Sequence, residues 1–317
     1  MRRRKQHMDI ISTTFKDAYK TFMAEKRAMN LSEQTLETYK LHIESFLEYN
    51  DLYECTTPVL CIDMYLWWIE DMQQDPKKKA VTVASYCRSV RAFIYWLQDN
   101  NFCLEFHMSI PKYQKEIKET YTDEELAILL EKPNEKECSE IDYQTWVFIN
   151  LIVATGLRLS SALNIKVASY VPKDKKIYVQ MTKNKKGQVT YINDEMSRIL
   201  NQYIKRFELT NNDYMFCTAE GTPLAKRTMQ DNVATYNRKN GVNKTSIHLM
   251  RHTFAKNYYE KTKDIYTLCH MLGHSNIGIT ENYLQDLGVK MENATAYNPQ
   301  QQYAKESQKK TRRGKLK

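Results

Sequence analysis

The first half of the sequence contains no glycine, because all eight glycines of the 317 residues lie at or after Gly156. Glycine takes positive φ values without a steric penalty, so the many tight turns of a strand-rich fold are hard to build without it. We therefore expect residues 1–155 to form helices joined by ordinary loops. The glycine patterns GxGxxG and GxxxxGK(S/T) are absent as well, which argues against dinucleotide-dependent and P-loop ATPase chemistry.

Long apolar runs and paired cysteines are also missing. No apolar run approaches the ~20 residues of a membrane-spanning helix, and the basic start of the chain leads into no apolar signal region. The seven cysteines are odd in number and include no CxxC pair, which favours reduced core thiols over a disulfide framework or a zinc ribbon. We expect a soluble, cytoplasmic protein without membrane contact.

The positive charge of the chain is concentrated at its two ends. There are 47 Lys and Arg against 38 Asp and Glu, a net charge of +9. Residues 2–5 carry four positive charges and residues 301–317 carry seven against one Glu, so residues 6–300 have a net charge of −1. Basic arms on a near-neutral body are typical of a polyanion-binding protein, although solubilising ends would have the same composition.

Apolar periodicity predicts four helices in the first third of the chain. They are expected near residues 15–22, 32–47, Pro58–Met72 and Val81–Leu97. Ser32 is a good N-cap for the second helix, and Pro58 suits the first turn of the third. Residues 107–119 contain charge and proline but no apolar period, which indicates a linker.

A mixed domain is expected after this linker. Thr122-Asp-Glu-Glu125 is a capping box that opens a helix, and a later apolar helix should stop at Gly156. Two β-prone runs on either side of residues 183–187 predict a hairpin with a basic tip. Further helices are expected near residues 194–208, 225–238, 247–261, 264–272 and 277–286.

Four of the seven histidines fall within 27 residues, at His248, His252, His270 and His274. Both i,i+4 pairs could share a helix face and bind zinc. However, no HExxH pattern is present, and no carboxylate stands between the histidines to act as a base. We therefore predict no metal site.

A phosphate site is the competing interpretation of these residues. His248 and Arg251 are at i,i+3 on one helix face, and their imidazole and guanidinium donors suit the oxygens of one anion. Arg158 directly follows the turn at Gly156, so its charge should lie against the core. A buried guanidinium needs a partner, which would be either an anion or a nearby Asp or Glu.

Three segments together resemble the tyrosine recombinase (phage integrase) family in residues, order and spacing. They are Ala154-Thr-Gly-Leu-Arg158-Leu-Ser, His248-Leu-Met-Arg251-His-Thr-Phe-Ala and Leu272-Gly-His274, followed nine residues later by Tyr283. Residues 31–39 and 90–97 are similar to the core-binding domain of that family. Ser161 departs from the pattern, because many members carry glutamate there, and Met250 replaces a commoner leucine.

The resemblance implies metal-free phosphoryl transfer without a cofactor. Tyr283 would attack a DNA phosphate and form a 3′-phosphotyrosine, Arg158 and Arg251 would neutralise its oxygens, and His248 and His274 would donate to it or move protons. The active lysine of the family lies on a β-hairpin, where Lys183 is our choice over Lys185 and Lys186. Lys185 and Lys186 are then expected to bind DNA, with Lys40, Arg88 and Arg91 of the helical domain. His252 and His270 are expected to be structural, His252 through a hydrogen bond in the core.

The expected fold is mainly α with a small β-hairpin or sheet: a helical core DNA-binding domain and a mixed α+β catalytic domain. The expected organisation is a basic arm at 1–11, the core-binding domain at 12–106, the linker at 107–119, the catalytic domain at 120–286, and a C-terminal segment with a basic tail at 287–317. Because the helical domain begins near residue 12, we expect a short Xer-like or transposon- or phage-borne integrase without an arm-binding domain.

The expected partners are double-stranded DNA recombination sites. The family resemblance implies a homotetramer on two duplexes, which passes through a Holliday junction and is monomeric or weakly associated in free solution. An accessory DNA-bending or directionality factor and association with the nucleoid would fit this activity. A type IB topoisomerase and a catalytically idle DNA-binding relative are the alternatives, and residues 287–304 either dock on a neighbouring protomer or form an extension.

Overall fold

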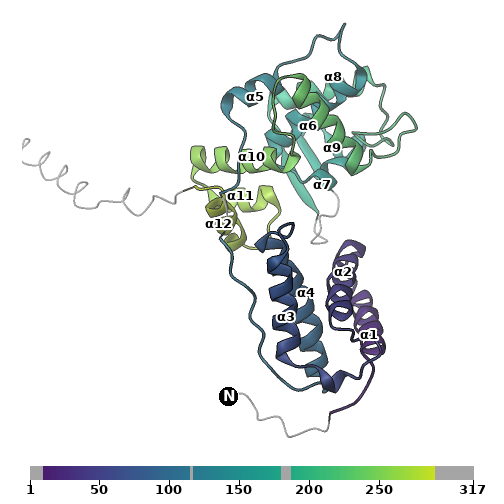
Figure 1. Ribbon diagram of the computed structural model, residues 1–317. Coiled ribbons are helices and arrows are strands. Elements are labelled where there is room, and N and C mark those ends of the chain that lie inside the picture. Colours follow the sequence, from purple (N-terminus) through teal and green to yellow (C-terminus); the bar gives the residue numbers. More distant parts are fainter. Residues whose placement is uncertain (1–9, 115–116, 180–186, 290–317) are drawn as a thin grey trace, which may run out of the picture. The chain divides into compact units, whose positions relative to one another are not determined.

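The computed structural model describes residues 10–114, 117–179 and 187–289 (Figure 1). The chain divides into two compact units, residues 1–115 and 116–317. Lys183, Lys185 and Lys186, the basic ends and the segment 290–304 lie outside the described residues.

The first unit is a helical bundle with an aromatic core. Its helices are α1 (Phe15–Ala28), α2 (Glu33–Tyr49), α3 (Ile62–Gln74) and α4 (Ala80–Asp99), with a short 3-10 turn at Thr57–Val59. The Phe22 ring meets those of Phe93 and Trp96 edge-on at centroid distances of 5.2 and 5.7 Å. Ser32 caps α2 as expected, because its hydroxyl accepts a hydrogen bond from the amide of Thr35.

The third helix begins at Ile62, so the expectation that it starts at Pro58 was wrong. Pro58 lies in the separate 3-10 turn. After it, the backbone of Leu60 and Cys61 is extended, and the Leu60 side chain is buried in the core. The fixed φ of proline suits a short turn as well as a helix start, so Pro58 alone does not distinguish between them.

The second unit is mixed, and its first part surrounds a small antiparallel sheet. It contains α5 (Asp123–Leu130), α6 (Glu140–Thr155), α7 (Leu159–Leu163), β1 (Tyr170–Val171), β2 (Lys176–Val179) and β3 (Gln188–Tyr191). The strand order is β1-β2-β3, with Ile177 opposite Thr190. The hairpin of β2 and β3 is the expected one, whereas β1 was not predicted because two residues are too few to show an alternating pattern.

Helices form the rest of this unit, at positions close to those expected from the sequence. They are α8 (Asp194–Arg206), α9 (Lys226–Lys239), α10 (Ile247–Thr262), α11 (Ile265–Leu272) and α12 (Ile277–Asp286). Helix α6 is buried over most of its length and packs against α5, α8, α9 and α10, as Figure 1 shows. A helix of this composition is stable only when it is buried. The expected fold class, mainly helical with a small sheet, is confirmed.

Two of the expected helix boundaries have the local geometry that the sequence indicates. Thr122 and Glu125 form both hydrogen bonds of a capping box at the start of α5. Helix α6 ends at Gly156, which is left-handed with φ 64°. In the part of the chain that the structure describes, no helix combines the length and apolar character needed to cross a membrane.

Candidate active site

Arg251 joins three segments that are far apart in the sequence. It is only 5% exposed on α10, and its guanidinium donates hydrogen bonds to the carbonyl oxygen of Gly156 at the end of α6 and, at 2.8 Å, to that of Leu272 at the end of α11. Arg158 follows Gly156 by two residues, and His274 follows Leu272 by two. The structure therefore gathers the early arginine, the HxxR segment and the LGH segment around one guanidinium.

His274 is held by hydrogen bonds at both ring nitrogens. Its Nδ1 lies 2.9 Å from the hydroxyl of the buried Thr280, and its Nε2 lies 3.4 Å from Nη2 of Arg251. A guanidinium can only donate, so Nε2 is the acceptor. The hydrogen of the neutral ring is then assigned to Nδ1, which donates it to Thr280.

Tyr283 lies on α12 between two histidines. Its ring centroid is 5.0 Å from that of His252 and 5.5 Å from that of His274, the latter in an edge-on arrangement. The hydroxyl of Tyr283 is buried near Arg251 and forms no hydrogen bond of ordinary geometry. A buried, unpartnered hydroxyl is costly in a folded protein, so this one calls for a functional explanation.

The site is electropositive. No carboxylate among the described residues forms an ion pair with Arg158 or Arg251, so within this part of the chain Arg158 lacks the Asp or Glu partner that the sequence left open. Burial and the charge of Arg158 lower the pKa of Arg251 to about 10. Two guanidinium groups close together without a carboxylate favour the binding of an anion.

The pKa values of the site follow from burial and these cations. Burial, Arg251 and Arg158 lower the pKa of His274 to about 4. The same three causes lower the pKa of His248, which lies on the exposed side of α10. Burial raises the pKa of Tyr283 while Arg251 and Arg158 oppose the rise. At neutral pH the histidines are therefore neutral and the tyrosine is protonated.

The base of the β-hairpin is attached to this site. The side-chain amide of Gln188 on β3 donates hydrogen bonds to the carbonyl oxygens of Met271, at 2.5 Å, and His270. A Cβ atom on Gly273 would lie 2.9 Å from Oε1 of Gln188 and 3.4 Å from Nη1 of Arg158. Gly273, with φ 62°, thus lets β3 and Arg158 approach the end of α11 closely.

Three residues predicted to bind DNA belong to the helical unit. Lys40 on α2 is exposed, and so is Arg88 on α4. Arg88 donates to the hydroxyl of Tyr113 at 3.4 Å, and Arg91 is half-buried with its guanidinium carbon 5.9 Å from the centre of the Tyr95 ring. Their role in DNA binding stays a prediction.

Sequence reasoning missed several residues next to Tyr283. Lys118, from the expected linker, has its Nζ 5.7 Å from the centre of the Tyr283 ring and forms a 3.0 Å ion pair with Asp286. His252 was expected to be hydrogen-bonded in the core, which was wrong, because its Nδ1 is buried without a partner. The i,i+4 spacing of His248 and His252 suggested a zinc site. No pattern in the sequence indicates that His252 contacts Tyr283.

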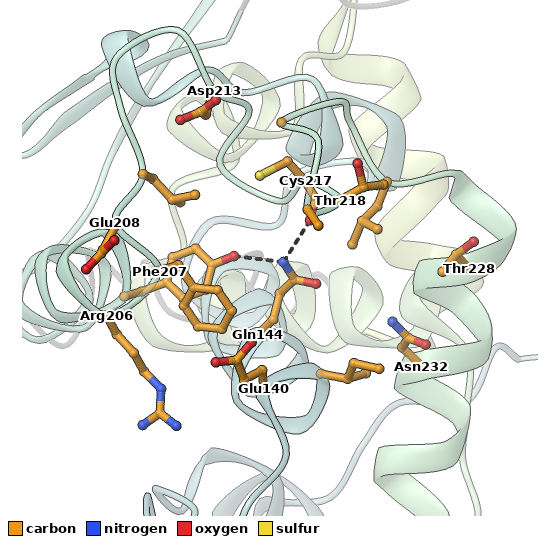
Figure 2. A pocket seen from close by; sticks show the side chains of 16 residues that line it. Glu140, Gln144, Arg206, Phe207, Glu208, Asp213, Cys217, Thr218, Thr228 and Asn232 are labelled. Carbon is orange, nitrogen blue, oxygen red and sulfur yellow. Dashed lines mark hydrogen bonds between the residues drawn. The ribbon is translucent and has the colours of Figure 1, made fainter.

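Among the described residues, no three or more His, Cys, Asp or Glu side chains are grouped so that they could hold a metal ion. A cavity of about 710 Å³ lies elsewhere in the second unit, lined by residues of α6, α8 and α9 and the loop before α9. Figure 2 shows Gln144 in this cavity, donating to the hydroxyl of Tyr203 and the carbonyl oxygen of Cys217. None of the motif residues lines it.

Comparison with known proteins agrees with this geometry. The model of the phage integrase family matches residues 119–288. The tyrosine recombinase XerC of Staphylococcus epidermidis is 28% identical over 270 residues, which cover 80% of this chain and 87% of the relative. XerD of Staphylococcus haemolyticus is 23% identical over 292 residues, covering 86% of this chain and 94% of the relative.

Solved structures share the fold. A lambda integrase tetramer bound to a Holliday junction has a TM-score of 0.70 at 14% identity, covering 90% of this chain and 81% of the other. The XerH site-specific recombinase bound to its difH substrate, before cleavage, has a TM-score of 0.65 at 20% identity, covering 84% and 80%. Because the family match spans more than half of the sequence, the chain belongs to the phage integrase family of tyrosine recombinases, the enzymes of site-specific DNA recombination.

Proposed function

We propose that Tyr283 is the nucleophile of this recombinase and that Arg158 and Arg251 bind the DNA phosphate that it attacks. The observation that carries the proposal is the meeting of two guanidinium groups, which have no carboxylate partner among the described residues, with the buried hydroxyl of Tyr283, on which the charge of Arg251 acts. A scissile phosphate between them would supply the missing anion to both arginines.

The reaction exchanges one phosphodiester for another. The oxygen of Tyr283 forms a bond to phosphorus as the bond to the 5′ oxygen breaks, which gives a 3′-phosphotyrosine and a free 5′ end. The covalent bond keeps the energy of the original linkage, so rejoining requires no ATP. Lys183 is proposed to give a proton to the departing 5′ oxygen.

The side chains around Tyr283 have the donors that such a transfer needs. A guanidinium has five N–H groups, and three of those on Arg251 are directed at Gly156, Leu272 and His274. The charge of Arg251 also acts on the Tyr283 hydroxyl, so a phosphate bound by the remaining N–H groups is proposed to lie next to that hydroxyl. His274 can donate to the phosphate only after Nε2 gains a hydrogen, since that atom accepts in this structure. His248 lies three residues before Arg251 and is proposed to hold an oxygen or assist proton transfer.

The proposed assembly follows from the relatives. A lambda integrase dimer has been solved on a core site and a tetramer on a Holliday junction. We propose that this chain likewise acts as a homotetramer on two DNA duplexes, within the cytoplasm and on the nucleoid, with Lys40, Arg88, Arg91, Lys185 and Lys186 contacting DNA. An accessory DNA-bending or directionality factor would fit the same assembly.

A covalent-trapping experiment tests this function. The protein is incubated, in EDTA and without ATP, with a pool of nicked duplexes that have a randomised core, and covalent adducts are recovered and sequenced. We expect adducts with wild-type protein and none with Tyr283→Phe, whose DNA binding should remain within about threefold. Adducts that persist in Tyr283→Phe would show that another residue is the nucleophile.

A further inference from the structure

Tyr283 and His252 each place a buried, unpartnered polar atom in the same small region. The hydroxyl of Tyr283 and Nδ1 of His252 are two of six such side-chain atoms among the described residues. Their rings are in contact, with centroids 5.0 Å apart and planes tilted by 39°. Each unpartnered atom costs about 1–3 kcal/mol. A tyrosine hydroxyl donates, and Nδ1 of a neutral histidine accepts when the ring hydrogen is on Nε2. In this tautomer the two atoms are chemically complementary.

We propose that His252 accepts the proton of the Tyr283 hydroxyl when the tyrosine oxygen attacks DNA. The proposal rests on the proposed function of Tyr283. In cleavage, the hydrogen passes from the tyrosine oxygen to Nδ1 of His252 while the oxygen–phosphorus bond forms and the bond to the 5′ oxygen breaks. In rejoining, the 5′-hydroxyl attacks phosphorus and gives its proton to Lys183, the bond from phosphorus to the tyrosine oxygen breaks, and His252 returns its proton to that oxygen.

The other two histidines of the motifs are less suited to this step. His252 and His274 are the histidines whose rings contact Tyr283 in the described part of the chain. Both nitrogens of His274 are engaged, Nδ1 with Thr280 and Nε2 with Arg251. His248 has no ring contact with Tyr283 among those that the structure describes. His252 alone combines contact with an unoccupied acceptor atom.

Asp286 and Lys118 contribute opposite charges near His252. Asp286 lies three residues after Tyr283 on α12, and its carboxylate favours the protonated form of His252. Lys118 fixes this carboxylate through the 3.0 Å ion pair and through a 2.8 Å hydrogen bond from its backbone amide to the Asp286 carbonyl oxygen.

Bound DNA would make His252 a stronger base. Burial and the charges of Lys118, His248 and Arg251 lower the pKa of His252 to about 4, with Asp286 opposing them. A phosphate held by Arg251 would offset part of the positive charge and raise this pKa. Proton transfer from Tyr283 to His252 would then become easier once DNA occupies the site. In the free enzyme, Tyr283 would stay protonated.

Single-turnover cleavage of a nicked suicide substrate tests the role of His252. We expect His252→Phe and His252→Asn to cleave about 10²–10⁴-fold more slowly, the usual effect of losing a general base. DNA binding should stay within about threefold, and rejoining from a trapped adduct should slow by a similar factor. His270→Asn is the matched control, because this exposed ring on α11 contacts Tyr266 and lies outside the catalytic groups.

A second readout separates proton transfer from a structural role. Replacing Tyr283 with a fluorinated tyrosine, whose phenol is more acidic, should restore much of the rate in His252→Asn and have a smaller effect with His252 present. The cleavage rate of the wild type should rise with pH through the pKa of His252 in the complex, because only the neutral ring accepts a proton. This rise should be missing in His252→Asn.

The outcomes are distinct. Cleavage by His252→Asn within threefold of wild type overturns the proposal, and so does a slow variant that fluorotyrosine fails to rescue and that keeps the wild-type pH profile. If His252→Phe does not fold, the comparison of His252→Asn with and without fluorotyrosine still decides. Absence of adducts with the wild type would overturn the proposed function, and with it the role of His252.

Discussion

The guanidinium of Arg251 donates a hydrogen bond to the carbonyl oxygen of Gly156, which lies 95 residues earlier in the sequence. Gly156 ends α6 and Arg158 follows it by two residues, so this bond fixes the two arginines with respect to each other. The second bond, from Arg251 to the carbonyl oxygen of Leu272, fixes the end of α11 that carries His274. Arg251 therefore contributes both to the fold and to the charge of the active site.

This double role predicts different effects of replacing the two arginines. Arg251→Lys should lower the free energy of unfolding by about 2–3 kcal/mol, because one ammonium group cannot satisfy both buried carbonyl oxygens. Arg158→Lys should lower it by less than about 1 kcal/mol, since no described hydrogen bond or ion pair to the Arg158 side chain is lost. Both variants should lose about 10²–10³-fold in adduct formation. Urea unfolding and suicide-substrate cleavage measure the two effects, and equal losses of stability would contradict this division.

Gly156 should tolerate no side chain. A Cβ atom there would lie 2.3 Å from Cδ1 of Phe254, and the residue has φ +64°. We expect Gly156→Ala to lose about 2–5 kcal/mol, the sum of a left-handed backbone and a steric clash. Gly241→Ala is the control, because Gly241 has φ +77° but no atom within 4 Å of a Cβ. It should lose only about 1–2 kcal/mol in urea unfolding.

Tyr283→Phe should not destabilise the protein, although it should abolish covalent adducts. The hydroxyl that it removes is buried and unpartnered, so the free energy of unfolding should stay constant or rise by up to about 2 kcal/mol. Tyr203→Phe removes a hydroxyl that accepts a 2.9 Å hydrogen bond from Gln144 and should cost about 1 kcal/mol. Thermal and urea unfolding compare the two. A similar loss in both variants would mean that the Tyr283 hydroxyl is hydrogen-bonded in solution.

Stability should fall as the pH drops from about 6.5 to about 4. Burial with nearby cations lowers the pKa values of His252 and His274 to about 4 in the folded protein, from 6.5. In this window the unfolded chain binds more protons than the folded one, so acid favours unfolding. Because both rings are partly exposed, we expect about 1–2 kcal/mol for each histidine, below the full value of such a shift. The fall, measured as the urea midpoint against pH, should be smaller in His252→Asn and His274→Asn, and an unchanged fall would refute the assignment.

The sequence alone was sufficient for much of the local structure. Apolar periodicity located most helices, the Thr122–Glu125 pattern indicated a capping box that is present, and Gly156 marked the end of α6 because only a left-handed residue closes that turn. These features depend on interactions within a few residues, which a short stretch of sequence contains. The helix start predicted at Pro58 was wrong, because a short turn and a helix start accept proline equally well.

The order and spacing of the arginine, HxxR and LGH segments also indicated the family without any coordinates. What only the tertiary structure decided is which side chains meet. The bond from Arg251 to Gly156, the contact of His252 with Tyr283 and the pairing of Lys118 with Asp286 all join residues of different elements. Such contacts depend on how α6, α10, α11 and α12 pack, and packing is set by many side chains at once rather than by any local pattern.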